Sequence, residues 1–348
     1  MIAKQKTERP QALKVCSPAA RIGIYPEVSQ DGIGTYIQGI KDLVGAECIP
    51  CQGGILSPRA FFTRMPENFD LIHVPHFLVP FHTRGFKVVC TIQDIIPIVE
   101  RGNVGFLKEK YLYFRIHWSL RKADHIIFTS LSTLNDVMRV FGKVGNHSVI
   151  PLAVEEPIEK QCISGSAYAF PYFFTVGRRR RHKNIEGILR AFAKVAITSR
   201  SHLVFGGKED IHDKQWKSMA ASLGILEKIH FTGFLTREEL ASHYRGAICL
   251  VFPSLYEGFG LPILEAMSYD CPVITSSTSS MPEVASDAAI LVDPRDVNSI
   301  SRAMLDLESD PALRSVLITK GRENSRRYSW KKTAESTMAV YQKTLKID

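Results

Sequence analysis

The sequence has 348 residues, which suits two domains of ordinary size. Hydrophobic residues make up 45% and charged residues 23%, as in a soluble globular protein. The net charge of +9 suits an anionic ligand or an anionic membrane face, and no nucleic-acid-binding motif accompanies it, so no nucleic-acid partner is expected. The sequence contains no run of about 18 apolar residues, so no transmembrane helix is expected. Residues 1–14 lack the apolar core of a secretory signal. We therefore expect a cytoplasmic protein.

Short apolar runs alternate with helical patterns through the first half of the chain. The strands expected there are 20–26, 71–75, 87–92, 125–130 and 147–152, with helical spacing at 35–44 and 106–122. Such alternation is typical of a parallel, doubly wound sheet.

The segment 106–122 interleaves aromatic residues with basic ones. It fits a helix that packs on the domain core with a solvated basic face, and this interpretation is favoured. It also fits a helix that rests on an anionic membrane, which would place the protein at the inner face of that membrane.

A polar stretch with Pro, Gly and Ser, residues 153–168, interrupts the alternation and is interpreted as a linker. The strands expected after it are 172–177, 202–207, 228–233, 248–254, 272–276 and 288–293, with helices at 184–198 and 237–245. We therefore expect two doubly wound domains, 1–155 and 168–328. A cleft between them would receive the loops that follow the strands.

The cysteines are seven, an odd number, and they are scattered. Cys48 and Cys51 have the spacing of a redox or zinc site, but no second pair follows them. We expect reduced structural thiols and neither a metal nor a cofactor.

A strongly basic loop, "TVGRRRRHKN" at 175–184, follows a predicted strand and precedes a predicted helix. Helix N-termini favour anions, and arginine or lysine adds charge-assisted hydrogen bonds. The loop therefore predicts a diphosphate site. Four arginines in sequence cannot all point into one cleft, so some of them are expected on the surface.

The stretch "LYEGFGLPILEAM" at 255–267 places two glutamates beside a glycine loop. Glycines let the backbone approach a ligand, and Pro262 fits the first turn of a helix that would carry Glu265. Glycosidase carboxylates must flank a bond from opposite sides, about 5–9.5 Å apart, which one loop-and-helix corner can hardly provide. Glu257 and Glu265 suit the holding of vicinal hydroxyls instead, one sugar each.

Two weaker signals lie in the first half. Asp31-Gly32-Ile33-Gly34 resembles a glycine loop but lacks the third glycine of a dinucleotide fingerprint, so a plain tight turn explains it equally well. Gln93 and Asp94 end a predicted strand. Asp94 could orient an acceptor hydroxyl or cap the next element.

Taken together, these motifs resemble family 4 glycosyltransferases, whose fold is GT-B. "PSLYEGFGLPILEAMSYDCPVITS" is similar to the region of that family with two glutamates at this spacing, and "VGRRRRHKN" looks like its phosphate loop. "DGIGTY", "VPHFLVP", "RKADHIIFTS" and "FTGFLTREELASHYRGA" resemble further family segments, so that the resemblance covers nearly the whole chain. "YSWKKTAESTMAVYQKTL" resembles its closing helix, which implies that residues 329–348 cross back to the first domain.

The resemblance implies a retaining transfer from a nucleotide-sugar to a glycan or lipid-linked glycan, without a metal. Glu257 would bind hydroxyls of the donor sugar, Glu265 those of the ribose, and Lys183 with Arg178 would neutralise the diphosphate. The backbone that would approach sugar and phosphate belongs to Gly258, Phe259, Gly260 and Leu261. Gly34 would approach the diphosphate from the opposite domain, and Tyr36 is an acceptor-side candidate.

Two positions depart from the family pattern. Gln93 stands where the family often has histidine, and a glutamine can hydrogen-bond a sugar but cannot carry a proton. His182 stands where close relatives often have arginine. The overall pattern looks most like mannosyltransferases, so GDP-mannose is the first expected donor. UDP-glucose or a UDP-N-acetylhexosamine is the alternative, and so is a degenerate protein that binds nucleotide-sugar without transfer.

Overall fold

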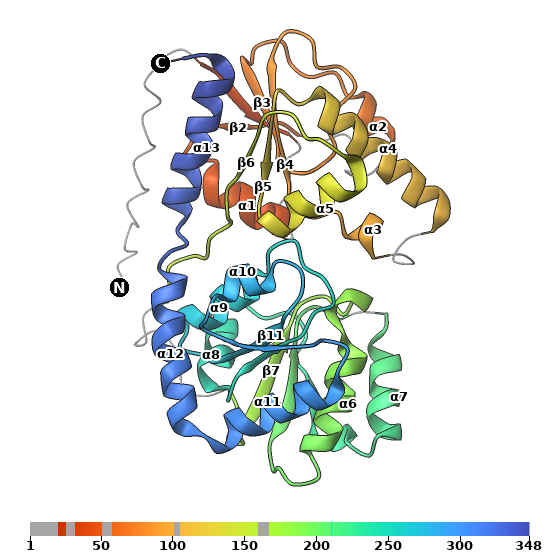
Figure 1. The fold of residues 1–348 in the computed structure, drawn as a ribbon, viewed down its shortest axis with the longest axis vertical. Coiled ribbons are helices and arrows are strands. Elements are labelled where there is room, and N and C mark those ends of the chain that lie inside the picture. Colours follow the sequence, from red (N-terminus) through yellow and green to blue (C-terminus); the bar gives the residue numbers. More distant parts are fainter. Residues whose placement is uncertain are drawn as a thin grey trace, which may run out of the picture.

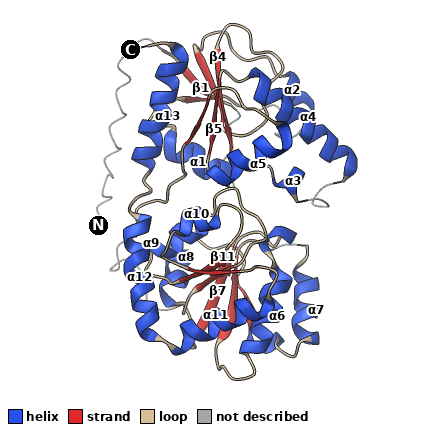
Figure 2. Ribbon diagram, in the orientation of Figure 1, coloured by secondary structure: helices blue, strands red, loops and turns tan. Residues whose placement is uncertain are grey.

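The computed structural model describes residues 20–25, 32–50, 58–100, 105–158, 167–209 and 211–347. They form two α/β domains stacked along the long axis of the molecule, and the C-terminal helices run alongside both (Figure 1). In each domain the helices surround a central sheet (Figure 2). The expectation of two doubly wound domains is confirmed.

The first sheet contains, within the described residues, six strands in the order β2-β1-β3-β4-β5-β6, and every neighbouring pair is parallel. Its strands are β1 (Ile22–Ile24), β2 (Glu47–Cys48), β3 (Leu71–Val74), β4 (Lys87–Ile92), β5 (His125–Phe128) and β6 (His147–Val149). The helices of this domain are α1 (Gly32–Ile40), α2 (Pro58–Phe62), α3 (Ile96–Val99), α4 (Phe106–Lys122) and α5 (Leu131–Phe141).

The second sheet contains six described strands in the order β12-β11-β10-β7-β8-β9, again all parallel. They are β7 (Tyr172–Val176), β8 (His202–Gly206), β9 (Ile229–Phe231), β10 (Leu250–Phe252), β11 (Val273–Ser276) and β12 (Ile290–Val292). The helices of this domain are α6 (Ile185–Val195), α7 (Asp213–Ser222), α8 (Arg237–Gly246), α9 (Leu261–Ser268), α10 (Met281–Ala285), α11 (Val297–Ser309) and α12 (Pro311–Ser325), with 3-10 turns η2 (Arg181–Lys183) and η3 (Leu226–Lys228). The last helix, α13 (Trp330–Leu345), packs on the first domain.

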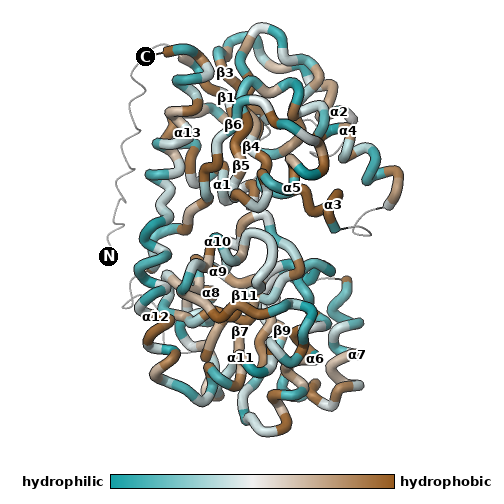
Figure 3. The backbone as a smooth tube through the Cα atoms, in the orientation of Figure 1, coloured by the Kyte–Doolittle hydropathy of each residue, from teal (hydrophilic) through white to brown (hydrophobic). Residues whose placement is uncertain are grey.

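The pattern of apolar runs predicted all of the longer strands, because buried parallel strands are continuously hydrophobic. Figure 3 shows hydrophobic colour gathered on the strands inside each domain. The short edge strand β2 was not predicted. The glycine loop or tight turn expected at 31–34 is wrong for its described part, since α1 already begins at Gly32 and continues to Ile40.

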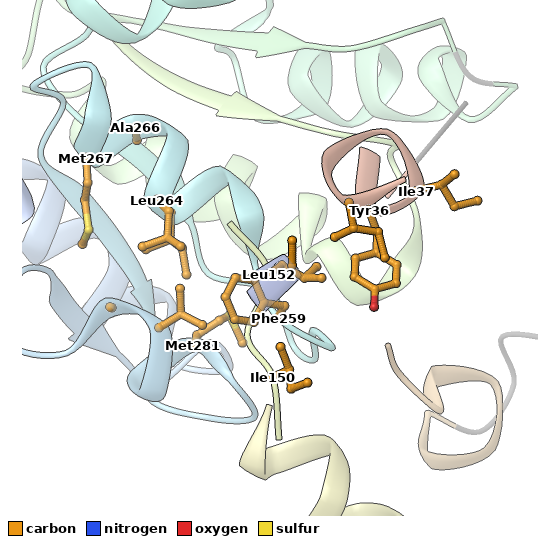
Figure 4. Packing of buried hydrophobic residues seen from close by; sticks show 14 of the residues in the cluster. Tyr36, Ile37, Ile150, Leu152, Phe259, Leu264, Ala266, Met267 and Met281 are labelled. Carbon is orange, nitrogen blue, oxygen red and sulfur yellow. The ribbon is translucent and has the colours of Figure 1, made fainter. Parts of the chain in front are cut away.

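One apolar cluster continues from the first domain into the second. Leu152, Phe259 and Met281 belong to it, and Phe259 is only 5% exposed. Figure 4 shows Leu152 and Phe259 at the centre of this packing, with Met281 on the side of the second domain. Two further clusters fill the opposite faces of the two sheets.

The C-terminal helix α13 is attached to the first domain by a buried polar network. Tyr341 Oη lies 2.6 Å from His73 Nδ1, and His73 Nε2 lies 2.7 Å from Thr91 Oγ1. Burial lowers the pKa of His73 to about 3, so the ring is neutral and shares hydrogen bonds without a charge. The chain passes between the domains twice side by side, where Val154 pairs with Ser329.

Two further expectations from the sequence concern the Cys48 and Cys51 pair and the absence of a transmembrane helix. Cys48 is half-buried, while Cys51 lies outside the described residues, so the pair is not seen together. No helix in the described part of the chain is both long enough and apolar enough to cross a membrane.

Candidate active site

The loop after β10 carries the glutamate motif to the boundary between the domains. Gly260 has φ of +101°, a left-handed conformation that glycine adopts without strain, and α9 starts directly after it with Pro262 in its first turn. The hydroxyl of Ser280 donates to the carbonyl oxygens of Glu257 (3.0 Å) and Phe259 (2.9 Å). The loop is therefore held in one shape before any ligand binds.

The basic loop after β7 is fastened to the glutamate loop. Asn184, which is left-handed with φ of +57°, donates through its amide to the carbonyls of Pro253 (3.0 Å) and Pro294 (2.6 Å). The backbone amide of Leu255 donates to the carbonyl of His182 at 2.7 Å. These bonds bring two loops that are far apart in the sequence to the same edge of the sheet, where parallel strands end.

Lys183 and Glu257 meet at this edge. Lys183 Nζ donates to Glu257 Oε1 at 2.6 Å, and the two side chains are 18% and 10% exposed. The ammonium also lies 4.7 Å from the centre of the Phe252 ring. A predicted phosphate-binding cation and a predicted sugar-binding carboxylate thus form one mostly buried ion pair.

Glu265 lies on α9 and is half-buried. Its Oε2 accepts a hydrogen bond from Tyr244 Oη at 2.9 Å, and burial raises the pKa of its carboxyl. The pKa of Tyr244 is also raised, first by burial and then by this neighbouring carboxylate, so the phenol remains a donor. Tyr244 was not predicted as a site residue, because nothing in the spacing of α8 relates it to the glutamate motif.

Two adjoining cavities lie along the domain boundary. The first, about 330 Å³, is lined by Gly32, Thr35, Gln93, Asp94, Ile96, Leu152, Lys183, Glu257, Gly258, Phe259, Gly260, Leu261, Pro262 and Glu265. The second, about 420 Å³, is lined by Thr35, Gln38, Ala153, Val154, Glu155, Phe234, Leu235, Thr236, Arg237, Leu240, Leu261, Glu265, Ser268 and Tyr269. Thr35, Leu261 and Glu265 line both, so Glu265 stands at the junction.

The first domain contributes Gln93 and Asp94 to the first cavity. Asp94 Oδ1 accepts from the amide of Ile96, the first residue of the short helix α3, at 3.0 Å. Burial raises the pKa of Asp94 to about 6, and the charge of Glu257 adds to this shift, while Lys183 opposes it. Asp94 is therefore close enough to the ion pair to sense both of its charges.

Two residues predicted from α1 do not reach the cavities. Gly34 is buried within the helix, and Gly32 and Thr35 line the first cavity in its place. Tyr36 is 1% exposed, and its hydroxyl lies 3.2 Å from Thr91 Oγ1 inside the first domain. The acceptor-side role expected for Tyr36 has no support in this geometry, because the helical period turns its side chain toward the core.

Some arginines of the basic loop lie on the surface, as the sequence predicts, but one of them is unexpectedly buried. Arg178 is exposed and lines a small recess together with Lys183. Arg179 is 1% exposed, donates to the carbonyl of Lys208 at 2.8 Å and lies 3.4 Å from the carboxylate of Asp213. Arg179 therefore fastens the loop after β8 to the basic loop, a structural role that the bare sequence does not reveal.

His182 is partly buried beside the ion pair. Burial lowers its pKa, an effect that Glu257 opposes and the neighbouring cations reinforce.

Within the described ranges, no group of three or more His, Cys, Asp or Glu side chains is arranged to hold a metal ion.

The chain is similar to known proteins in both sequence and fold. Residues 163–324, nearly all of the second domain, match the family model of glycosyl transferases group 1. O-antigen chain mannosyltransferase B of Escherichia coli is 29% identical over 305 residues, which cover 82% of this chain and 78% of that protein. The mannosyltransferase WbdA of Escherichia coli is 26% identical over 339 residues, which cover 92% of this chain and 40% of that protein.

The structural similarity extends over both domains. A crystal structure of HepE from Anabaena in complex with UDP-glucose superposes with a TM-score of 0.74 at 14% identity, and the match covers 93% of this chain and 99% of that one. At this identity the likeness concerns the fold alone, and the fold is GT-B, as the sequence resemblance implied.

Proposed function

We propose that this chain is a group 1 glycosyltransferase that transfers a hexose from a nucleotide-sugar to a glycan or lipid-linked glycan acceptor in polysaccharide assembly. The observation that carries the proposal is the pairing of Lys183 with Glu257 in a cavity between the domains. One group is suited to a phosphate and the other to sugar hydroxyls, and both line the same cavity.

The two cavities divide the donor between them. The hexose and diphosphate would occupy the cavity of about 330 Å³ beside Glu257 and Lys183. The base would occupy that of about 420 Å³ beside Phe234, a residue that is 74% exposed and whose ring offers a stacking surface. Glu265, at the junction, would accept hydrogen bonds from the ribose hydroxyls.

Transfer breaks the bond between the hexose anomeric carbon and the diphosphate, so negative charge grows on the departing phosphate. Lys183 would stabilise that charge from a mostly buried position, where a fixed cation acts more strongly than in water. Arg178 lines the recess beside Lys183 and would add a second cation. We propose that these side chains do the work without a metal ion and that the configuration of the sugar is retained.

Asp94 is the acceptor-side candidate of the first domain. It faces the cavity opposite the glutamate loop, and its pKa of about 6 leaves it ionised at neutral pH. A carboxylate there would accept a hydrogen bond from the attacking hydroxyl and orient it. Gln93, its neighbour, would contribute hydrogen bonds only, because an amide does not titrate.

GDP-mannose is the first proposed donor, in view of the relatives named as mannosyltransferases. UDP-glucose or a UDP-N-acetylhexosamine is the alternative, which the UDP-glucose bound to HepE favours. A panel of GDP- and UDP-sugars, first by thermal shift and then by release of GDP or UDP, distinguishes them. Stabilisation by one donor without any turnover would favour a binding protein over an enzyme.

Two variants test the roles within the site. Glu257→Ala should abolish transfer while the nucleotide still binds, and near-normal turnover would refute the sugar-binding role. Lys183→Ala should weaken the affinity for GDP or UDP, measured by calorimetry. Unchanged affinity would contradict the phosphate role.

We also propose that the first domain rests on an anionic membrane where its acceptor is lipid-linked. Phe62, Phe81 and Phe114 are 59%, 44% and 50% exposed and cluster around Phe61 and Trp118. The exposed basic residues of the adjacent helix α4 are Lys108, Lys110, Arg121 and Lys122. An apolar centre with a basic margin is the chemistry that anionic lipid surfaces favour.

Vesicle sedimentation tests this contact. A Phe62→Ser and Phe114→Ser double variant should bind vesicles containing phosphatidylglycerol less well than the wild type does. Ile197→Ser, at a position that is 81% exposed on the second domain, is the matched control and should bind like the wild type. Equal binding of all three proteins would contradict the contact.

A further inference from the structure

Helix α5 and its N-cap residue meet the second domain at three places. Figure 1 shows α5 at the lower edge of the first domain, facing the part of the second domain that holds α10. Ser130, the residue before α5, is the N-cap of the helix, and its hydroxyl accepts from the amide of Thr133 at 3.1 Å.

The first contact holds the residue after Glu257. Ser130 Oγ donates to the carbonyl oxygen of Gly258 at 2.7 Å, and Thr133 Oγ1 lies 3.2 Å from the same oxygen. A Cβ at Gly258 would lie 2.1 Å from the carbonyl oxygen of Gln93, so a glycine is required here for the domains to approach this closely.

The second contact holds the residue before Glu257. Tyr256 Oη donates to Asp136 Oδ2 at 2.6 Å, and the ring of Tyr256 is buried. Residues on both sides of the candidate sugar-binding glutamate are therefore bonded to α5 of the opposite domain. The position of Glu257 therefore depends on the first domain as well as on the second.

The third contact supplies a charge that α5 lacks. The helix has no acidic residue in its first turn, although a helix N-terminus favours one. The carboxylate of Glu283, on α10, accepts from the amide of Leu131 at 3.0 Å and lies 3.4 Å from the amide of Ser132. An acidic side chain of one domain thus fills the N-terminal site of a helix in the other.

We infer that Glu283 is a positioning residue whose contact with α5 keeps the domains closed and sets Glu257 for transfer. The expected effect of Glu283 on transfer rests on the proposed function, whereas its expected effect on the closure of the domains does not. The contact exists only while the domains are together, since Glu283 and the α5 amides belong to different domains. Its loss therefore affects the step that needs closure more than the binding of nucleotide to the second domain.

The test compares Glu283→Ala and Glu283→Gln with Asp287→Ala. Asp287 follows α10 and pairs with Lys320 of its own domain at 2.9 Å, so it is a matched acidic control outside the contact. We expect Glu283→Ala to lower kcat about tenfold, with nucleotide affinity and melting temperature unchanged. Glu283→Gln, which keeps an acceptor oxygen but no charge, should lie between Glu283→Ala and the wild type, and Asp287→Ala should match the wild type.

The outcomes separate the contact from the proposed function. An unchanged kcat in Glu283→Ala, or an equal loss of kcat and nucleotide affinity, would overturn the positioning role. If the wild type transfers no sugar from any donor, the proposed function fails, but small-angle scattering still measures closure. Glu283→Ala should then have a larger radius of gyration than the wild type and Asp287→Ala, and equal radii would overturn the inference.

Discussion

The ion pair between Lys183 and Glu257 should be energetically coupled even without donor. Its atoms are 2.6 Å apart, and its side chains are 18% and 10% exposed. Among the described residues, Lys183 is the one cation paired with this carboxylate. Lys183→Met removes the charge and keeps the length of the side chain, so it leaves a mostly buried carboxylate unpaired.

The expected magnitude follows from the geometry. At an effective dielectric constant of about 20, two charges 2.6 Å apart attract by roughly 6 kcal/mol, and their desolvation offsets much of this. Breaking a buried pair costs about 3–5 kcal/mol. We expect the low end, about 3 kcal/mol for Lys183→Met, because both side chains retain some contact with water. The Lys183→Met, Glu257→Gln double variant leaves no charge, so a coupling energy of about 2 kcal/mol should appear.

Urea unfolding of the four proteins of this cycle measures the coupling, using the transition of the second domain, which carries both residues. The matched control is the cycle at Arg190 and Glu186, an exposed pair on α6 whose side chains are 52% and 58% exposed. That pair should couple by less than about 0.5 kcal/mol. A coupling this small at Lys183 and Glu257 would refute the reasoning, because the two groups would then act independently.

Three further predictions concern the domain boundary and its supports. Gly258→Ala should lower kcat at least about tenfold while nucleotide still binds, because the added methyl group would fall 2.1 Å from the carbonyl oxygen of Gln93; unchanged kinetics would contradict the closed arrangement. Tyr341→Phe should lower the free energy of unfolding by about 1–3 kcal/mol in a urea titration, since it leaves the buried Nδ1 of His73 without its hydrogen bond. Burial raises the pKa of Asp94 from 3.8 to about 6, so its contribution to stability is present below about pH 4 and is lost as the pH rises through 6. The wild type should therefore lose stability relative to Asp94→Asn as the pH rises across that window, and the kcat of the wild type should rise through pH 6. Stability profiles of the two proteins that run parallel with pH would argue against a carboxyl whose pKa is raised by burial.

The fold was predictable because its main signal is local. Runs such as 87–92 and 106–122 match β4 and α4 to the residue, since continuous apolar runs mark buried parallel strands and mixed periodic ones mark helices. The start of α1 was missed because glycines at 32 and 34 indicate a turn locally, although the packing of α1 against α13 keeps them in a helix. Helix propensity is a weak signal that tertiary contacts override.

The candidate site was predictable where one loop carries it. Glu257, Gly258, Phe259, Gly260, Leu261 and Glu265 all line the first cavity, and so does Lys183. Gly34 and Tyr36 do not, because their places depend on how α1 turns against the C-terminal helix. Arg179 and Tyr244 were missed since their partners come from other strands and helices.

The sequence by itself determined the alternation of strands and helices, the spacing of the two glutamates and the cations that follow β7. Each of these is a relation between residues within a few turns of one another. Only the tertiary structure decided that Lys183 meets Glu257, 74 residues away, and that Glu283 meets the amide of Leu131, 152 residues away. The physical reason is that such contacts depend on the packing of whole domains, which the local pattern of polar and apolar residues does not encode position by position.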